Sequence, residues 1–236
     1  MTLHEWSRRV AALGQFRVAD PALPVLSRDD DHHLRRVLRA NVGEEIVVTN
    51  GGGDWSFATV TDVGLARVSD VTVDPTPEPI TLYLAPVKGE RGEWAIAKAT
   101  ELGVTRVVPL VCARLTVAFR GDFATKTLAR WRRIAKESAG QCRRTYDVLI
   151  DEPAKVADVP DEVVVADFGG TAAWAPVRAV AIGPEGGWAP GEWGEERVRV
   201  GLGSTVLRAE TAAVAAATLM AAARDAWGST AAAGNR

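Results

Sequence analysis

The sequence predicts a two-part α/β protein, in which a small β-rich domain precedes a larger domain built on a parallel sheet. After residue 80, apolar extended segments alternate with segments of helical spacing, the pattern of a parallel α/β sheet. Before residue 75, short segments rich in Val, Ile and Thr are separated by turn signals. Between them, residues 75–79 read Pro-Thr-Pro-Glu-Pro, which predicts a short, stiff linker.

The first domain, residues 1–74, is expected to hold one helix and three strands. Residues 30–40 place Leu34, Val37 and Leu38 at helical spacing. The expected strands are 45–50, 55–62 and 67–73, and the first two are separated by the turn sequence Asn-Gly-Gly-Gly-Asp.

The second domain, residues 80–228, is expected to alternate strands and helices, with a frayed tail at 229–236. Helix 94–102 ends at Gly103, a natural C-cap, and helix 124–139 is expected to stop at Gly140. Continuous apolar runs predict strands that are covered on both faces. The strands expected here are 80–87, 107–111, 163–167, 177–182 and 198–200, and helix 210–227 closes the domain.

The composition excludes several classes of protein. The chain has 236 residues, of which 47% are hydrophobic and 25% charged, with a formal net charge of −2, so bulk charge indicates neither a nucleic-acid binder nor a membrane-surface protein. The longest apolar run, 212–223, is shorter than the roughly 20 residues that span a bilayer, and the N-terminus lacks the order of a secretory signal. Two cysteines and three histidines support neither a disulfide framework nor a metal site. We therefore expect a cytoplasmic protein without a bound metal.

Three glycine-bearing loops follow predicted strands, where ligand sites gather in open parallel sheets. They read Phe168-Gly169-Gly170, Gly183-Pro184-Glu185-Gly186-Gly187-Trp188 and Gly201-Leu202-Gly203-Ser204. Each alone fits an ordinary tight turn, but glycines also let the main chain approach a ligand closely, so their density favours a nucleotide-like ligand. Neither a P-loop nor a Gly-x-Gly-x-x-Gly fingerprint is present, which disfavours a kinase, an ATPase or a Rossmann dehydrogenase.

Arg208 stands at the predicted start of the last helix. Capping accounts for Glu210 and Thr211, because acidic and hydroxyl side chains suit a helix N-terminus. A cation there is disfavoured and needs a partner, which could be Glu210, Glu185 or a ligand.

Basic residues are concentrated in two segments. Residues 114–144 hold nine Arg and Lys against two acidic residues, and Arg35, Arg36 and Arg39 follow His32 and His33. A solvated helix face and a polyanion-binding surface both fit; the excess of arginine, which suits bidentate phosphate contacts, favours the second. Residues 1–74 carry eight Arg against eleven acidic residues, so any RNA contact in that domain must be local.

Several motifs together resemble a known family. They are His33-Leu34-Arg35-Arg36-Val37-Leu38-Arg39, Lys88-Gly89-Glu90, residues 98–104, Arg133-Ile134-Ala135-Lys136-Glu137 with Gln141-Cys142, residues 182–187, and Leu202-Gly203 with residues 206–212. On these the chain resembles the bacterial 16S ribosomal RNA (uracil-N3)-methyltransferases of the SPOUT superfamily. Gly140 and the stretch after Tyr146 depart from the family pattern, which affects the expected RNA contacts rather than the two strongest motifs.

The resemblance implies a small PUA-like β-barrel domain that helps to hold RNA, followed by an α/β methyltransferase domain with a deep trefoil knot. It implies a homodimer that uses S-adenosylmethionine to methylate N3 of a uridine in 16S ribosomal RNA of the small subunit, near the decoding centre. The implied catalytic residues are Arg208 and Glu210. The implied cofactor-binding residues are Phe168, Ile182, Gly183, Pro184, Glu185, Gly186, Gly187, Leu202, Gly203, Val206 and Leu207. The RNA-binding candidates are Arg8, Arg9, His33, Arg35, Arg36, Arg39, Lys88, Arg130, Arg133, Arg143 and Arg144.

Two other functions stay open. One is a SPOUT enzyme of another specificity, such as a ribose 2′-O-methyltransferase. The other is an RNA-binding assembly factor that keeps the fold but transfers no methyl group. For methylation of uracil N3, the general base could be Glu210 or Glu185.

Overall fold

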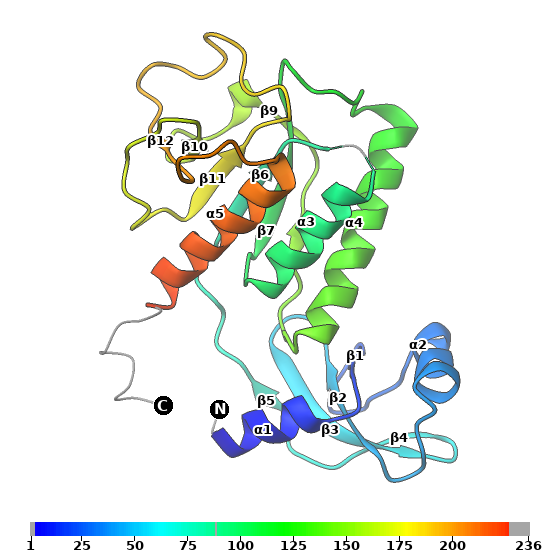
Figure 1. Ribbon diagram of the computed structural model, residues 1–236. Helices are drawn as coiled ribbons and strands as arrows, with labels where there is room; N and C mark the ends of the chain where they lie inside the picture. Colours follow the sequence, from blue (N-terminus) through cyan, green and yellow to red (C-terminus); the bar gives the residue numbers. More distant parts are fainter. Residues whose placement is uncertain (1–2, 88, 227–236) are drawn as a thin grey trace. The chain divides into compact units, whose positions relative to one another are not determined.

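The computed structural model describes residues 3–87 and 89–226, which form two compact units (Figure 1). Unit 1 holds the described residues up to 77 together with residues 139–147, and unit 2 holds the rest. Lys88 and the predicted tail 229–236 lie outside the described residues.

Unit 1 is built on a small sheet in the order β1-β2-β3-β4, with β5 paired to β3. β1 runs parallel to β2, and the other pairs are antiparallel. Its elements are α1 (Leu3–Ala11), β1 (Gln15–Arg17), α2 (Arg28–His32), the π-helix η1 (His33–Val37), β2 (Glu45–Thr49), β3 (Asp54–Thr61), β4 (Gly64–Arg67) and β5 (Thr72–Val73). Its main core lies between β1–β4 and the helical segment around Leu34.

Three details of unit 1 differ from the sequence prediction. A second helix, α1, precedes the sheet; it was not expected because most of its side chains are polar and exposed. The expected helix begins earlier, at Arg28, because the Ser27 hydroxyl caps it by accepting the Asp30 amide at 3.1 Å. The expected strand 67–73 is interrupted at residues 68–71, so that β4 and β5 pair with opposite ends of β3.

Residues 139–147 belong to unit 1, although the linear prediction placed them in the second domain. Main-chain hydrogen bonds join Gly53 N to Thr145 O at 3.1 Å and Asp147 N to Gly51 O at 2.9 Å. The Tyr146 hydroxyl donates to Asp74 O at 2.7 Å. The segment therefore continues the hydrogen bonding of the β2–β3 turn, a tertiary contact that local sequence patterns do not encode.

A buried ion pair joins α1 to Asp74, which directly follows β5. The Arg9 side chain is 3% exposed and donates to Asp74 Oδ2 at 3.0 Å. Asp74 also accepts the Trp55 indole N–H at 2.9 Å and the Thr145 hydroxyl at 2.7 Å. Burial alone would raise the pKa of Asp74, but the hydrogen bonds from Thr145, Trp55 and Arg9 outweigh it and lower that pKa below its ordinary value.

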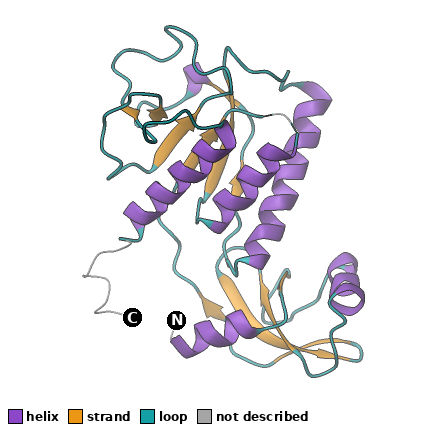
Figure 2. Cartoon of the chain, in the orientation of Figure 1, coloured by secondary structure: helices purple, strands orange, loops and turns teal. Residues whose placement is uncertain are grey.

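Unit 2 is a parallel sheet in the order β12-β10-β11-β6-β7-β8, with β9 also paired to β7 (Figure 2). Its elements are β6 (Thr81–Leu84), α3 (Glu90–Glu101), β7 (Arg106–Val111), α4 (Gly121–Gln141, shared with unit 1), β8 (Leu149–Ile150), β9 (Ala154–Lys155), the 3-10 turn η2 (Val156–Asp158), β10 (Val164–Ala166), β11 (Ala179–Ile182), β12 (Arg199–Val200) and α5 (Ala209–Arg224). The predicted parallel α/β sheet is confirmed.

The two faces of this sheet are covered differently. One core packs Leu82 and Leu84 of β6 against the apolar sides of α3, α4 and α5, the helices seen together in Figure 1. The opposite core packs Tyr83 and Val165 against Trp193 and the turn at Val159 rather than against a long helix. Strand residues alternate between the two cores, and this accounts for their continuous apolar character.

Element ends in unit 2 shift where tertiary contacts override local signals. α4 runs through Gly140 to Gln141, so the expected stop at Gly140 is wrong; the chain turns at Arg143, whose φ is 62°. β6 ends at Leu84 rather than at 87, and α3 begins at Glu90 after Gly89 with φ 68°. The short strands β8 and β9 were not predicted, because two-residue strands carry no periodic signal.

The loops that follow β10 and β12 touch through their main chains. A Cβ built on Gly201 would lie 2.6 Å from Gly170 O, and one built on Gly170 would lie 2.5 Å from Val200 C. The Trp174 indole N–H donates to Gly201 O at 2.9 Å and fastens the same contact. Two glycines are therefore required here, because no side chain fits between the loops.

Replacing Asp74 by Asn tests the buried pair in unit 1. We expect the free energy of unfolding near neutral pH to fall by about 2 kcal/mol, since a charged hydrogen-bonding partner is lost. Because the pKa of Asp74 is lowered in the folded state, its contribution is present above the unfolded pKa of about 4 and is lost as the pH falls through the folded value. Urea unfolding below and above this range measures both effects. An equally steep loss of stability on acidification in wild type and variant would contradict the assignment.

Replacing Gly201 by Ala tests the loop contact in unit 2. The added methyl meets main-chain atoms, so we expect a loss of about 2 kcal/mol in the free energy of unfolding. Gly194→Ala is the matched control, because a Cβ there meets nothing within 4 Å. Thermal melting of the two variants provides the measurement. If Gly201→Ala melts at the control's temperature, the contact does not constrain the loops.

Candidate functional site

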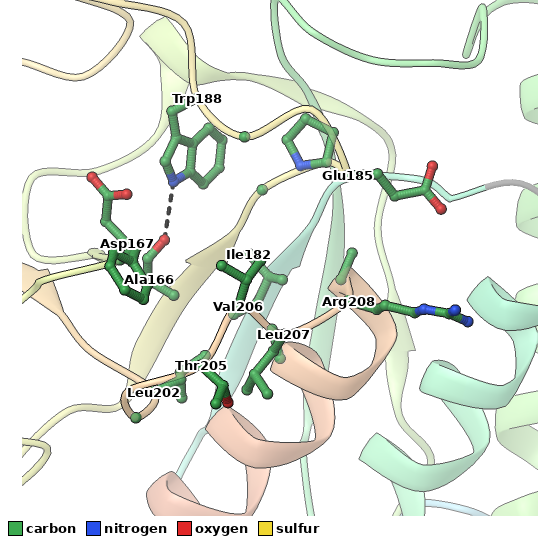
Figure 3. Close-up of a pocket in the computed structure, with 17 residues that line it drawn as sticks. Ala166, Asp167, Ile182, Glu185, Trp188, Leu202, Thr205, Val206, Leu207 and Arg208 are labelled. Atoms are coloured by element: carbon green, nitrogen blue, oxygen red, sulfur yellow. Dashed lines mark hydrogen bonds between the residues drawn. The ribbon is translucent and has the colours of Figure 1, made fainter.

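A pocket of about 320 Å³ opens at the carboxyl ends of β10, β11 and β12 (Figure 3). Residues 166–168 follow β10, residues 182–185 and 187–188 follow β11, and residues 202–203 and 205–208 lie between β12 and α5. Ala209 and Ala212 of α5 complete the lining. The pocket therefore combines three strand ends and one helix start, the place where open parallel sheets bind ligands.

Trp188 joins two of these loops. Its indole N–H donates to Ala166 O at 3.0 Å, as the dashed line in Figure 3 shows. Its ring lies so close to Gly183 that a Cβ there would come within 3.0 Å of it. Glu192 holds the following turn, since its carboxylate accepts the amides of Ala113 and Ala189. The loop after β11 is thus fixed from both sides.

The pocket is apolar in its side chains and polar in its main chain. Ile182, Leu202, Val206 and Leu207, labelled in Figure 3, are among the apolar residues that line it. Glycines at 183, 187 and 203 leave main-chain groups accessible beside these apolar surfaces. Such a site suits a flat heteroaromatic ligand that is sandwiched by apolar groups and read by main-chain hydrogen bonds.

Charged groups gather at one end of the pocket. The side chains of Glu185 and Arg208 extend to the same side in Figure 3. Arg91, in the first turn of α3, lies with Nη1 2.5 Å from Glu185 Oε1 and 4.0 Å from Glu210 Oε1. Arg208 is exposed, and none of the residues that the structure describes hydrogen-bonds or ion-pairs with its guanidinium. The sequence left Glu185, Glu210 and a ligand open as partners of Arg208. In the structure both glutamates lie beside Arg91 instead.

The structure brings most of the predicted cofactor-binding residues together. Ten of the eleven line this pocket. The exception is Gly186, which packs against Arg114, whose guanidinium donates to Gly186 O at 3.2 Å. That these eleven residues bind the cofactor stays a prediction.

The two predicted catalytic residues occupy different positions. Arg208 lines the pocket and is the N-cap residue of α5. Glu210 lies in the first turn of that helix, buried beside Arg91 and outside the pocket lining.

The predicted RNA-binding arginines of unit 1 divide into internal and exposed groups. Arg9 is 2% exposed and joins α1 to Asp74 and to the carbonyl of Arg143, which indicates a structural role. Arg143 is half-buried and donates to Ala12 O at 2.6 Å, which indicates a structural role. Arg8 pairs with Glu45 and stacks on Phe57.

The remaining RNA candidates are more accessible. His33, Arg36 and Arg39 are exposed on or just after η1, and Arg35 pairs with Asp31 at 2.9 Å. Arg144 is half-buried, with its carbonyl accepting from Gln15. In unit 2, Arg130 pairs with Glu93 and Arg133 with Glu137, both at 2.7 Å. Lys88 lies outside the described residues.

Sequence reasoning missed three residues of the site. Arg91 follows the quoted Lys88-Gly89-Glu90 motif, yet nothing local shows that it faces two glutamates from distant segments. Trp188 directly follows the glycine loop, and that position was a usable signal. Asp167, at the end of the predicted strand, lines the pocket and pairs with Arg199 at 2.6 Å.

Other chemistries find little support. Across residues 3–87 and 89–226, no three His, Cys, Asp or Glu side chains are grouped so as to hold a metal ion. Burial raises the pKa of the Cys112 thiol to about 12, so this thiol is protonated near neutral pH and is not a nucleophile. None of the helices in the described part of the chain has the length and apolar character to cross a membrane.

Known sequences resemble this chain along most of its length. Residues 74–221 match the family model of the RNA methyltransferase domain, and residues 26–68 match that of the RNA methyltransferase PUA domain. Ribosomal RNA small subunit methyltransferase E of Mycobacterium tuberculosis is 31% identical over 223 residues, covering 83% of this chain and 84% of that protein. The Bacillus subtilis protein of the same name is 29% identical, covering 79% and 85%.

Solved structures of methyltransferases are similar to this fold. A ribosomal RNA small subunit methyltransferase E from Neisseria gonorrhoeae, bound to S-adenosylmethionine, superposes with a TM-score of 0.73 at 27% identity, covering 88% of this chain and 96% of that one. A Legionella pneumophila structure with bound S-adenosylmethionine gives a TM-score of 0.77 at 27% identity, covering 89% and 97%. The predicted SPOUT-type α/β domain preceded by a PUA-like domain is confirmed. The trefoil knot stays a prediction.

With a family model that spans more than half of its residues and relatives that match it nearly end to end, the chain belongs to the RNA methyltransferase family.

Proposed function

We propose that this protein transfers the methyl group of S-adenosylmethionine to N3 of a uridine in the 16S ribosomal RNA of the small ribosomal subunit. The small-subunit methyltransferases at 29–31% identity support the RNA substrate. The choice of uracil N3 as the methylated atom rests on the sequence motifs that resemble the (uracil-N3)-methyltransferases. The proposal includes action as a cytoplasmic homodimer.

The observation that carries the proposal is the pocket formed by the three glycine-bearing loops. Its volume of about 320 Å³ and its apolar side chains suit an adenosine moiety. The main chain around Ile182–Gly187 and Leu202–Leu207 would supply the hydrogen bonds, and the open space around Gly187 and Gly203 would let a ligand approach. Two neighbours of this fold hold S-adenosylmethionine, which supports the same ligand here.

When bound, S-adenosylmethionine supplies a methyl group already activated by a sulfonium, so the protein must mainly align the acceptor. Uracil N3 is a weakly acidic imide and attacks well only after losing its proton. Arg208, exposed at the pocket rim without a described partner, would stabilise the negative charge that develops on a neighbouring uracil oxygen. Glu210 and Glu185, both beside Arg91, are the candidates for accepting the proton.

RNA would be held by exposed basic groups. His33, Arg36 and Arg39 on unit 1, and Arg130 and Arg133 on α4, present their side chains to solvent. Phosphate contacts of this kind would offset the unstacking needed to bring a uracil into the pocket.

Small ribosomal subunits that lack the modification provide the test. The protein is incubated with them and a methyl-labelled donor, and the RNA is then digested and analysed by mass spectrometry. The proposal expects label on a uracil base at N3. Label on a ribose would instead indicate a 2′-O-methyltransferase. No transfer, together with no calorimetric binding of S-adenosylmethionine, would indicate an RNA-binding assembly factor.

Replacing Arg208 by Ala tests the charge-stabilising role. We expect turnover to fall by about 100-fold or more, as for loss of one preorganised donor at a developing anion. The melting temperature should stay close to that of wild type, because Arg208 is exposed and makes no hydrogen bond or ion pair within the described chain. Arg106→Ala, at an exposed arginine paired with Asp151 away from the pocket, is the control. Methylation by Arg208→Ala at the control's rate would remove Arg208 from the mechanism.

A further inference from the structure

Three side chains from three separate segments form a charge cluster beside the pocket. Arg91 comes from the first turn of α3, Glu185 from the loop after β11, and Glu210 from the first turn of α5. Arg91 Nη1 lies 2.5 Å from Glu185 Oε1 and 4.0 Å from Glu210 Oε1. One guanidinium thus serves two carboxylates.

The two carboxylates are not equivalent. Glu185 lines the pocket, with a side chain 28% exposed, and its carboxylate holds the guanidinium directly. The Glu210 side chain is only 10% exposed, and its Oε2 is buried without a hydrogen-bond partner anywhere in the described chain. A buried carboxylate oxygen without a donor is unfavourable and calls for an explanation. An incoming donor that completes its hydrogen bonding would provide one.

The charged groups near Glu210 come from three segments of the chain. α3 contributes Arg91, the loop after β11 contributes Glu185 through Arg91, and α5 contributes Arg208 two residues before Glu210. Arg91 is therefore the only cation that the described residues place in an ion pair with Glu210. Arg91 therefore holds the Glu210 carboxylate through Oε1, and Oε2 is the oxygen left without a donor among the described residues.

We propose that Arg91 is a positioning residue of the methyl-transfer site: its guanidinium, held by Glu185, fixes Glu210 through Oε1 and leaves Oε2 to accept the N3 proton of the target uracil. This inference rests on the proposed function and chooses between the two glutamates. N3 gives its proton to Glu210 Oε2 and forms the bond to the methyl carbon. The electron pair of the broken carbon–sulfur bond stays on sulfur, which becomes neutral, and Glu210 later releases the proton to solvent.

The test compares full-length wild type, Arg91→Gln and Arg91→Lys in single-turnover methylation of unmodified small subunits across the pH range. We expect Arg91→Gln to lower the rate near neutral pH by at least about tenfold, within the range that general-base catalysis contributes. The acidic limb of its pH–rate profile should move to higher pH, and raising the pH should restore part of the rate. Arg91→Lys keeps the positive charge and should retain most of the rate with the wild-type profile.

A matched control and a binding measurement separate this role from a structural one. Lys98→Gln removes a cation from the same helix, where it pairs with Glu101 at 2.8 Å, and should leave the rate and profile unchanged. Calorimetric affinity for S-adenosylmethionine should change by less than about threefold in Arg91→Gln, because Arg91 does not line the pocket.

Two outcomes would overturn the inference. One is a wild-type rate and profile in Arg91→Gln. The other is a pH-independent loss of rate that Arg91→Lys shares and that accompanies lost cofactor affinity, as expected if Arg91 only maintains the fold. If wild type itself transfers no methyl group to the subunit, the proposed function fails instead, and the two failures are thereby distinguished.

Discussion

The pocket depends on a contact that involves no side chain, the approach of the Gly170 and Gly201 main chains at the ends of β10 and β12. These strands are neighbours in the sheet, so their following loops leave it side by side and must either diverge or touch. Because both positions lack a Cβ, they touch, and Trp174 fastens them. The loop after β11 is then held to the same assembly by Trp188. Loops fixed in this way present a preformed main-chain surface to a ligand.

The sequence was informative wherever local chemistry determined structure. The continuous apolar runs predicted the central strands, and the glycine loops predicted the pocket, because a need for close main-chain approach is visible as glycine. Arg91 could not be predicted in the same way. Its partners, Glu185 and Glu210, lie about one hundred residues away along the chain, and only the sheet order brings them to α3. α1 was missed for a related reason, since its stabilising partners Glu45 and Asp74 lie on other elements.

Counting charges along the chain overstated the surface available to a polyanion. Several of the arginines that were counted are used within the fold. Arg9 is enclosed with Asp74, and Arg132 donates to Ile150 O and Glu152. Arg36 and Arg39 remain exposed, so a smaller set of cations is available for phosphate than the sequence indicates. A guanidinium with five donors serves equally well to join distant main-chain segments, and sequence alone does not separate the two uses.

The inclusion of residues 139–147 in unit 1 has a consequence for biosynthesis. The β2–β3 turn and Asp74 obtain hydrogen-bonding partners from residues 145–147, a stretch of chain that is translated later than either of them. Since chains emerge from the ribosome in order, the N-terminal body cannot close its last hydrogen bonds while it is the only part that has left the exit tunnel. Its completion must await the long helix α4, which couples the maturation of the two halves of this polypeptide in time.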